Sequence, residues 1–266
     1  MINAGVLGSP IAHSLSPLLH QTAYQLMGIA GKYNAYEVAS GQLQNFLAGE
    51  GRELNCLSLT MPLKEEAMTI AEHVADISRQ IASGNTLVKK SDGWHLTSTD
   101  VEGFNYALLS SGKSEIKSLL VIGAGATARA VVAACAGASI SVIGRSSARM
   151  NSLQVAAPNS DFTFLQWGSE VDFNSFDLIV NTTPGNSAEI YANMVVNPRS
   201  TLFEVIYNPW PTKLLAAWKN SGAASIDGLD LLIHQAISQI QLFSGIEVNR
   251  AFLAKELRAK ALATLG

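Results

Sequence analysis

Short apolar runs alternate with segments of helical spacing along most of the 266-residue chain. Apolar runs rich in Val, Ile and Leu predict buried strands, and apolar positions three and four residues apart predict amphipathic helices. This alternation is typical of an α/β protein with mainly parallel sheets. The predicted strands are Gly5–Leu7, Tyr33–Val38, Cys56–Leu59, Thr86–Val88, Leu119–Ile122, Ile140–Ile143, Phe162–Leu165, Leu178–Val180 and Leu202–Val205.

A glycine-rich turn joins the predicted strand Leu119–Ile122 to a predicted helix over 126–136. Gly123 permits a tight reversal, Gly125 lets the backbone approach a pyrophosphate, and Ala128 lets the helix pack close to the strand. The N–H groups at the helix start would face the phosphates. The turn therefore predicts a dinucleotide site, although small residues chosen only for packing are the alternative. Its expected residues are Gly123, Ala124, Gly125, Ala126, Thr127 and Ala128.

The residues after the next predicted strand indicate which dinucleotide binds. Folds that prefer NAD usually end this strand with Asp or Glu, which holds the ribose 2′-hydroxyl. Here Gly144 is followed by Arg145, Ser146 and, three residues further on, Arg149. Guanidinium and hydroxyl groups suit a 2′-phosphate, so we predict NADP(H). A solvated basic loop is the alternative.

The position of the glycine turn predicts two domains, because at least four strands precede it. We expect an α/β substrate-binding and catalytic domain over 1–101, and a Rossmann-like, doubly wound NADP-binding domain over 102–228, with a cleft between them. Two further helices are predicted, Leu229–Phe243 and Val248–Leu262. We expect them to pack back on the first domain, so that 229–266 completes it.

Two helix starts in the first domain carry polar residues that could bind a substrate. Ser16 stands before Pro17, a pattern that predicts an N-cap, and Ser14 adds a second hydroxyl that could help to bind a carboxylate. Asp100 is predicted to cap a helix that runs to about Leu109, at the junction of the two domains. Ordinary capping is the alternative for each of them.

Lys64 lies near the start of a helix that is predicted to run to Val74, with Thr60 as a possible cap and Pro62 early in the helix. The positive end of a helix dipole disfavours an ammonium group, unless a carboxylate compensates for it. A lysine that exchanges a proton benefits from such tuning. A solvated surface lysine is the alternative.

Seven ordered segments together carry a specific likeness. The chain resembles the shikimate dehydrogenase family over nearly its whole length. The matching segments are Gly8–Pro17, Ser58–Glu65, Asn85–Val88, Thr99–Phe104, the glycine turn, Tyr207–Thr212 and Gly228–Ala236.

The resemblance implies reversible NADPH-dependent reduction of 3-dehydroshikimate to shikimate, a step of chorismate and aromatic amino acid biosynthesis. It also implies that Lys64 and Asp100 form the catalytic pair, with Lys64 acting either as proton donor or as electrostatic clamp. The implied substrate residues are Ser14 and Ser16 for the carboxylate, Thr60, Asn85, Asp100 and Gln235 for the hydroxyls, and Tyr207 for the pocket wall. The implied cofactor residues beyond the two loops above are Thr182, Gly228 and Leu231.

Several positions depart from the family pattern. Ser58 stands where the family commonly has Asn, and Gly144-Arg145-Ser146 replaces an Asn-Arg-Thr motif. The segment Asn181–Asn186 lacks the usual Gly-Met ending, and Leu231 replaces a frequent Met. Two alternatives therefore stay open: a sibling enzyme with a preference for quinate or for another cofactor, and a non-catalytic NADP-binding sensor.

Composition narrows the remaining classes. The net charge of −3 and the lack of basic runs argue against a nucleic-acid partner, and no apolar stretch predicts a membrane span or a signal peptide. Cys56 and Cys135 look like buried thiols of a cytoplasmic protein. The five histidines show no ligand spacing, so we predict no metal. We expect a small-molecule substrate and a monomer or homodimer.

Overall fold

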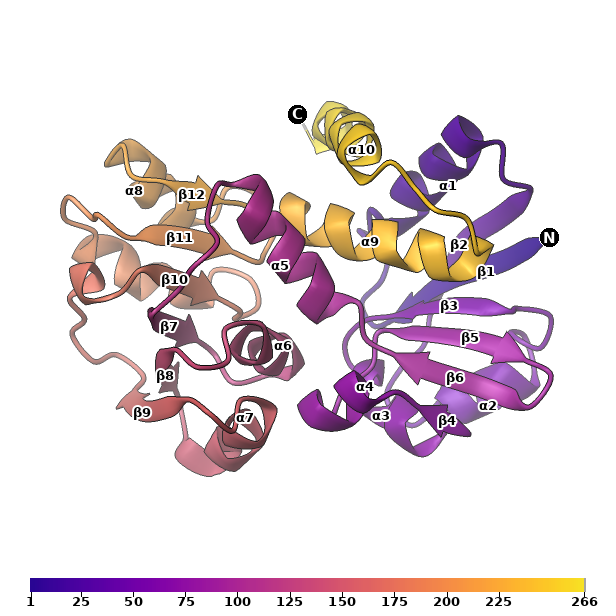
Figure 1. The fold of residues 1–266 in the computed structure, drawn as a ribbon, viewed down its shortest axis with the longest axis horizontal. Helices are drawn as coiled ribbons and strands as arrows, with labels where there is room; N and C mark the ends of the chain where they lie inside the picture. Colours follow the sequence, from indigo (N-terminus) through magenta and orange to yellow (C-terminus); the bar gives the residue numbers. More distant parts are fainter. Residues whose placement is uncertain (266) are drawn as a thin grey trace. The chain divides into compact units, whose positions relative to one another are not determined.

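The computed structural model describes residues 1–265 and divides into two compact units (Figure 1). The first unit comprises Met1–Gly103 and the C-terminal segment from Leu232 onward. The second comprises Phe104–Leu231. The limits fall two residues after the expected 101 and three after the expected 228, inside helices α5 (Asp100–Ser110) and α9 (Gly228–Ser244).

The first unit is built on a six-stranded sheet of order β2-β1-β3-β5-β6-β4. Strand β5 runs antiparallel to both of its neighbours, and the other pairs are parallel. The strands are β1 (Ile2–Gly8), β2 (Gly31–Glu37), β3 (Cys56–Leu59), β4 (His73–Val74), β5 (Thr86–Lys90) and β6 (Gly93–Thr97). The helices are α1 (Ser16–Met27), α2 (Leu43–Ala48), α3 (Leu63–Glu66), α4 (Asp76–Ile81) and α10 (Arg250–Leu265), besides parts of α5 and α9.

Strand alternation gives this sheet two different faces. Leu57 and Leu59 of β3 pack with α2 and α3 in a core that also contains Leu43, Leu63 and Trp94. The intervening Ser58 is also buried, and its hydroxyl bonds to Gln239 of α9. One face is therefore purely apolar at β3, whereas the other carries buried polar groups.

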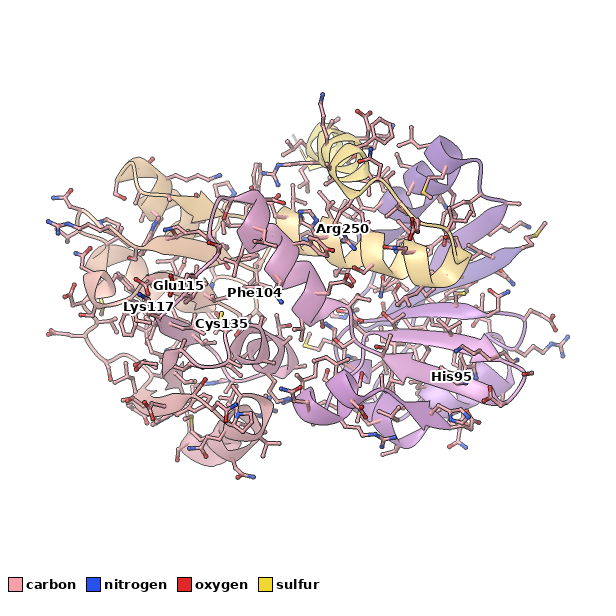
Figure 2. The ribbon with its side chains drawn as sticks, viewed as in Figure 1. His95, Phe104, Glu115, Lys117, Cys135 and Arg250 are labelled. Atoms are coloured by element: carbon pink, nitrogen blue, oxygen red, sulfur yellow. The ribbon has the colours of Figure 1, made fainter. Side chains whose placement is uncertain are left out.

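The second unit is built on an all-parallel sheet of order β12-β11-β10-β7-β8-β9. Read from β9 to β12, with the strands numbered in chain order, this is 3-2-1-4-5-6, the Rossmann order, with helices expected on both faces. Phe104 of α5, labelled in Figure 2, stacks on Phe203 with ring centroids 4.7 Å apart. The strands are β7 (Ser118–Ile122), β8 (Ser139–Gly144), β9 (Asp161–Gln166), β10 (Leu178–Asn181), β11 (Thr201–Glu204) and β12 (Ser225–Ile226), and the helices are α6 (Ala126–Ala134), α7 (Met150–Ala156) and α8 (Lys213–Asn220).

Local structure differs from expectation at two helix starts. The prediction of one helix from about Pro62 to Val74 is wrong: α3 ends at Glu66, a 3₁₀ turn (Ala67–Thr69) follows, and His73–Val74 forms β4. Pairing of β4 with β6 overrides the helical spacing of the apolar residues. The capping role predicted for Ser16 is also wrong, because Ser16 is the first residue of α1.

Three strands carried no clear sequence signal. They are β4, β6 and β12, and two of them have only two residues. Among residues 1–265, no helix has the length and apolarity that a membrane crossing requires.

Candidate active site

The polar residues predicted in the first unit lie along one edge of its sheet. Strands β1, β3 and β6 end at this edge, and the antiparallel β5 begins there. Lys64 follows β3 on α3, Asn85 directly precedes β5, and Asp100 follows β6 at the start of α5. The carbonyl of Lys64 accepts a hydrogen bond from the N–H of Gly84 at 2.9 Å, which fixes α3 beside Asn85.

Lys64 and Asp100 form a sheltered ion pair. The Lys64 ammonium donates to Asp100 Oδ2 at 2.7 Å, and the two side chains are only 16% and 8% exposed. The other oxygen, Oδ1, accepts a hydrogen bond from Asn85 Nδ2 at 2.9 Å. Asp100 was expected to precede and cap α5, but it begins that helix, and its carboxylate bonds to Lys64 and Asn85. An ammonium group held in this way can stabilise or protonate an oxygen anion.

Asn85 is the centre of the cluster. Its Nδ2 also contacts Thr99 Oγ1 at 3.0 Å and Gln235 Oε1 at 3.2 Å. Its Oδ1 accepts hydrogen bonds from the Thr99 N–H at 2.8 Å and from the Thr86 hydroxyl at 2.7 Å. These partners fix the orientation of the amide, so it presents its N–H groups to Asp100 and Gln235.

Gln235 comes from α9, 150 residues after Asn85. Helix α5 passes so close to α9 that a Cβ at Gly103 would lie 2.7 Å from the Gln235 backbone nitrogen. Arg250, labelled beside α9 in Figure 2, donates to the His234 carbonyl at 3.0 Å and to Ser238 Oγ at 2.9 Å. The close crossing and the arginine hold the helix that carries Gln235.

The two serines and Thr60 lie at the carboxyl ends of β1 and β3. Ser14 is half-buried, and its Oγ accepts a hydrogen bond from the Ser16 N–H at 3.3 Å. Ser16 is buried. Thr60 is half-buried, and its carbonyl, not its side chain, accepts a hydrogen bond from the Leu63 N–H at 2.8 Å. Helix α3 has no side-chain cap, so the cap expected from Thr60 is absent.

The glycine turn of the second unit lies between β7 and α6. Gly123 has φ +112°, and a Cβ there would come within 2.5 Å of Thr182 Oγ1 at the end of β10. Adjacent strands β7 and β10 form the point at which the strand order reverses, the place where doubly wound folds bind ligands. Gly125 precedes α6 and has no atom within 4 Å of an added Cβ, so its backbone is open to a ligand. Ala128 is fully buried beneath it, whereas Ala124, Ala126 and Thr127 are half-buried.

The basic residues expected at the 2′-phosphate follow β8, which pairs with β7. Arg145, Ser146 and Arg149 are all exposed. Arg149 Nη1 lies 3.5 Å from the Ala124 carbonyl, so its guanidinium reaches the glycine turn. The Ser146 hydroxyl accepts a hydrogen bond from the Ala148 N–H at 3.2 Å and caps the following 3₁₀ turn. These residues and the open helix start fit a phosphorylated dinucleotide.

Known proteins share this pattern. Residues 6–87 match the family model described as the shikimate dehydrogenase substrate binding domain. The NADP⁺-dependent shikimate dehydrogenase of Prochlorococcus marinus (strain AS9601) is 32% identical over 265 residues, which cover 91% of this chain and 92% of that protein. The chain belongs to the shikimate dehydrogenase family.

Solved structures of family members have the same fold. The Mycobacterium tuberculosis shikimate dehydrogenase has a TM-score of 0.87 at 34% identity, with 97% of this chain and 100% of the other covered. Shikimate 5-dehydrogenase from Thermus thermophilus, solved in complex with NADP(H) and shikimate, has a TM-score of 0.83 at 27% identity, with 98% and 100% covered.

One departure from the family pattern lies in a buried hydrogen-bond chain that was not foreseen. The Tyr33 hydroxyl donates to Ser58 Oγ at 2.6 Å, and Ser58 donates to Gln239 Oε1 at 2.7 Å. Gln239 Nε2 then donates to the Asn85 carbonyl at 3.0 Å and to Thr86 Oγ1 at 2.9 Å. Burial raises the pKa of Tyr33, so it stays protonated and acts as a donor. These hydrogen bonds support Asn85 through its carbonyl, and they pass through Ser58, which the sequence predicts to depart from the family pattern.

A second unforeseen feature is the buried carboxylate of Glu204 at the end of β11. Burial raises the pKa of Glu204, although Asn181 Nδ2 donates to it at 2.9 Å and the Thr212 hydroxyl at 2.7 Å. Glu204 thereby fixes both ends of the loop that carries Tyr207, which is half-buried. The sequence did hold one signal for this feature, because Glu204 is a charged residue inside the predicted apolar strand Leu202–Val205.

Gly228 and Leu231 lie at the start of α9, within the second unit. A Cβ at Gly228 would collide with the Val205 carbonyl, so glycine is required for the close approach of α9 to the end of β11. Leu231 is 7% exposed, which leaves little of its side chain to contact a cofactor.

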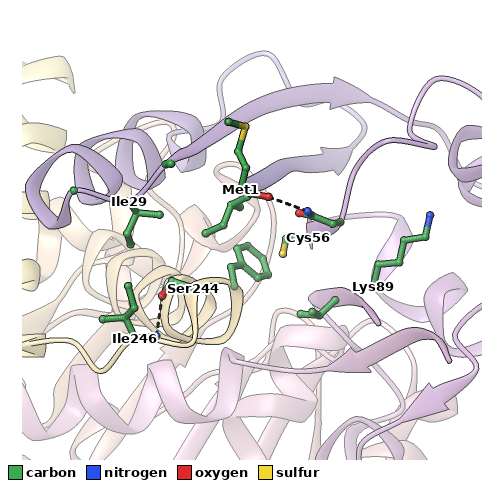
Figure 3. A pocket seen from close by; sticks show the side chains of 12 residues that line it. Met1, Ile29, Cys56, Lys89, Ser244 and Ile246 are labelled. Carbon is green, nitrogen blue, oxygen red and sulfur yellow. Dashed lines mark hydrogen bonds between the residues drawn. The ribbon is translucent and has the colours of Figure 1, made fainter. Parts of the chain in front are cut away.

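The hollow in Figure 3 lies at the opposite edge of the first sheet from Lys64. It has a volume of about 490 Å³. Its lining includes Met1 and Cys56 at the amino ends of β1 and β3, Lys89 of β5 and Phe243 of α9. Burial raises the pKa of Cys56 to about 12, so its thiol is a poor nucleophile. This hollow contributes nothing to the Lys64 cluster.

Proposed function

We propose that this protein catalyses the reversible NADPH-dependent reduction of 3-dehydroshikimate to shikimate, in chorismate and aromatic amino acid biosynthesis. The observation that carries the proposal is the 2.7 Å contact of Lys64 with Asp100 inside the Asn85 cluster. A protein that only senses a nucleotide needs no sheltered proton-transfer pair. The Rossmann strand order supports the choice of cofactor, as do Arg149, which reaches the Ala124 carbonyl of the glycine turn, and Arg145, which follows β8.

The first unit would bind the substrate and the second the cofactor. Ser14 and Ser16 would hold the substrate carboxylate at the end of β1. Thr60, Asn85, Asp100 and Gln235 would bind hydroxyl groups at the same sheet edge, and Tyr207 would line the pocket. When bound, NADPH supplies the hydride that forms the new C–H bond at the ketone carbon.

Lys64 acts on the oxygen of the reacting carbonyl. As that carbon gains the hydride, the π-electron pair of the C=O bond moves to the oxygen, and the Lys64 ammonium stabilises it and passes it a proton. Asp100 holds the ammonium in position and balances its charge. In the reverse direction, neutral Lys64 accepts the proton of the shikimate hydroxyl.

The cofactor would lie on the glycine turn. The N–H groups at the start of α6 and the backbone of Gly125 would contact the pyrophosphate. Arg145, Ser146 and Arg149 would bind the 2′-phosphate, with Thr182, Gly228 and Leu231 near the nicotinamide. Leu231 is the weakest of these assignments, because its side chain is almost fully buried.

A four-way assay tests this function. Absorbance of the reduced nicotinamide is followed with shikimate or quinate, each with NADP⁺ or NAD⁺. The highest kcat/KM is expected for shikimate with NADP⁺. Faster turnover of quinate with NAD⁺ would instead assign the chain to the quinate sibling, and tight NADP⁺ binding without turnover would assign a sensor.

The remaining properties follow from composition. A net charge of −3 favours a small-molecule partner over nucleic acid or an anionic membrane surface. We place the enzyme in the cytoplasm, where reducing conditions keep thiols such as Cys56 and Cys135 free. Size-exclusion chromatography with light scattering distinguishes the monomer from the homodimer.

A further inference from the structure

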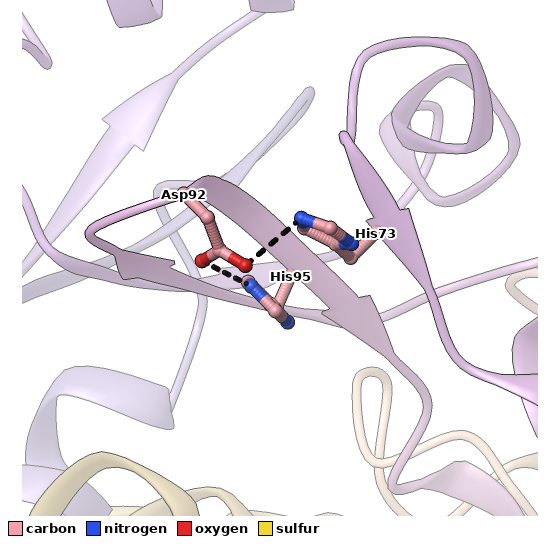
Figure 4. Close-up of side chains that lie close together, drawn as sticks. All are labelled: His73, Asp92 and His95. Atoms are coloured by element: carbon pink, nitrogen blue, oxygen red, sulfur yellow. Dashed lines mark hydrogen bonds and ion pairs between the residues drawn. The ribbon is translucent and has the colours of Figure 1, made fainter.

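Two histidines and an aspartate lie close together at β4 and β6, the last two strands in the order of the first sheet (Figure 4). His73 of β4 lies directly opposite His95 of β6 in the parallel pairing. Asp92 precedes β6 in the turn that joins β5 to β6. The two histidines lie 22 residues apart in the sequence, so their spacing does not predict a metal site. The pairing of β4 with β6 brings them together.

The ligand atoms already face one another. Asp92 Oδ2 lies 3.1 Å from His73 Nε2, and Asp92 Oδ1 lies 2.8 Å from His95 Nε2. The two imidazole rings stack with centroids 4.2 Å apart and planes 24° apart. One ligand atom from each residue fits within a span of 4.8 Å.

Contacts of the next two residues, Gly93 and Trp94, with Glu72 fix the backbone that carries Asp92. Gly93 has φ +118°, and a Cβ there would lie 2.6 Å from the Glu72 carboxyl carbon. Glu72 Oε2 accepts the N–H of Trp94 at 2.6 Å, and the Trp94 side chain is buried in the core. Since the contacts of Glu72 and Trp94 set the turn, the three ligand residues stand on a defined scaffold rather than on a free loop.

We propose that His73, Asp92 and His95 bind one divalent transition-metal ion of the zinc, nickel or copper type. Two imidazole nitrogens and one carboxylate oxygen match the ligand preference of these ions, whereas magnesium and calcium prefer oxygen ligands alone. Bonds of about 2.0–2.1 Å in tetrahedral geometry place ligand atoms about 3.3 Å apart. The aspartate–histidine distances are already near that value, and small side-chain rotations would bring the two nitrogens together.

The ion would replace the His95–Asp92 hydrogen bond and the His73–Asp92 contact with metal–ligand bonds, and water would fill its remaining positions. The side chains of His73 and Asp92 are 49% and 55% exposed, so the site is open to solvent. It would tie the two-residue strand β4 to the β5–β6 hairpin. The ion would therefore stabilise the fold of the first unit and leave the hydride-transfer chemistry unchanged.

Calorimetric titration with Zn²⁺ tests the proposal. The full-length protein is used without a histidine tag, after treatment with a chelator and dialysis. One Zn²⁺ is expected to bind per chain with a dissociation constant in the micromolar range, about −8 kcal/mol. His73→Ala and His95→Ala should each weaken binding at least ~10-fold, because each removes a ligand. His13→Ala, which removes another exposed histidine, should bind Zn²⁺ like the parent protein.

Two further readouts separate a built site from loose surface binding. Co²⁺ should give visible d–d absorption that disappears in His95→Ala. Saturating Zn²⁺ should raise the Tm of the parent protein by about 2–5 °C and leave that of His73→Ala unchanged.

The control variants keep the test decisive. Both alanine variants should keep the far-UV circular dichroism spectrum and the cooperative urea unfolding of the parent protein, which shows that they fold. The absence of saturable one-to-one binding would overturn the proposal, as would undiminished binding in folded His73→Ala and His95→Ala. These outcomes are independent of the four-way activity assay.

Discussion

The Lys64–Asp100 pair gives the sharpest prediction, because it links stability and turnover in one cycle of variants. The variants are Lys64→Met, Asp100→Asn and the double substitution, which keep side-chain shape but remove charge. At 2.7 Å and an effective dielectric constant near 20, the attraction between the charges is about 6 kcal/mol. Most of it offsets the removal of both groups from water.

Breaking a buried pair leaves one charge uncompensated, which destabilises proteins by about 3–5 kcal/mol. Lys64→Met should fall at the low end, about 3 kcal/mol, because Asn85 still donates to Asp100 at 2.9 Å. The double variant should lie within about 1 kcal/mol of the parent, because no buried charge is left alone. Urea unfolding at neutral pH gives these free energies, provided that the slope with denaturant is unchanged.

Turnover should follow a different pattern. Lys64→Met should lower kcat about 100-fold or more, at least ~2.7 kcal/mol in activation free energy, and leave NADP⁺ affinity nearly intact. Asp100→Asn should lower kcat less, and the double variant should match Lys64→Met, since Asp100 acts through Lys64.

Adding Asp100→Asn to Lys64→Met should therefore restore the free energy of unfolding, whereas kcat should stay as low as in Lys64→Met alone. Multiplied losses of kcat in the double variant would refute the view that the two residues act as a unit. Unchanged turnover in Lys64→Met would remove that residue from the mechanism.

Three further changes probe other parts of the molecule. Arg145→Ala should raise KM for NADP⁺ far more than KM for NAD⁺ in the steady-state assay, and equal effects would exclude 2′-phosphate recognition there. Burial lowers the pKa of His20 to about 3, so below its usual 6.5 only the unfolded chain takes up that proton and stability falls as the pH falls. His20→Phe should accordingly abolish about 1.4 kcal/mol of destabilisation between about pH 7.5 and 5.5 in urea unfolding, and an unaltered pH dependence would contradict this. Gln239→Leu should reduce kcat because it removes the N–H donated to the Asn85 carbonyl, whereas Ser58→Ala, which leaves that contact in place, should reduce kcat less; equal losses would assign Gln239 a purely structural role.

Local signals were enough for every strand of the second unit except β12. Its strands are consecutive apolar runs joined by helices, so the elements and the right-handed parallel topology follow from pattern and connection rules. The glycine turn was recognisable because Gly123 has a backbone conformation that few other residues adopt and Gly125 leaves the backbone open before α6. The partners of Glu204 were not predicted, because Asn181 lies on a neighbouring strand and Thr212 lies beyond the loop that follows β11.

The first unit depends more on contacts between distant residues. Apolar residues from Leu63 to Val74 have helical spacing, yet the pairing of His73 with His95 draws the second half of that segment into the sheet. The Tyr33–Ser58–Gln239 chain joins residues 25 and 181 positions apart, so periodicity could not predict it. The resemblance named Lys64 and Asp100 as partners, and the backbone shows why: β3 and β6 end at the same sheet edge.

The antiparallel strand β5 explains how the first unit collects its chemistry at one edge. Parallel strands alone would place at this edge only residues that follow strands. Because β5 runs the other way, Asn85 precedes it and still lies between Lys64, which follows β3, and Asp100, which follows β6. The same reversal leaves room for the Ser58–Gln239 contact below Asn85, since Ser58 pairs with Thr86 across the β3–β5 ladder. The antiparallel direction of β5 thus positions the Asn85 amide that contacts Asp100, and it places Asn85 where Gln239 of α9 donates to its carbonyl.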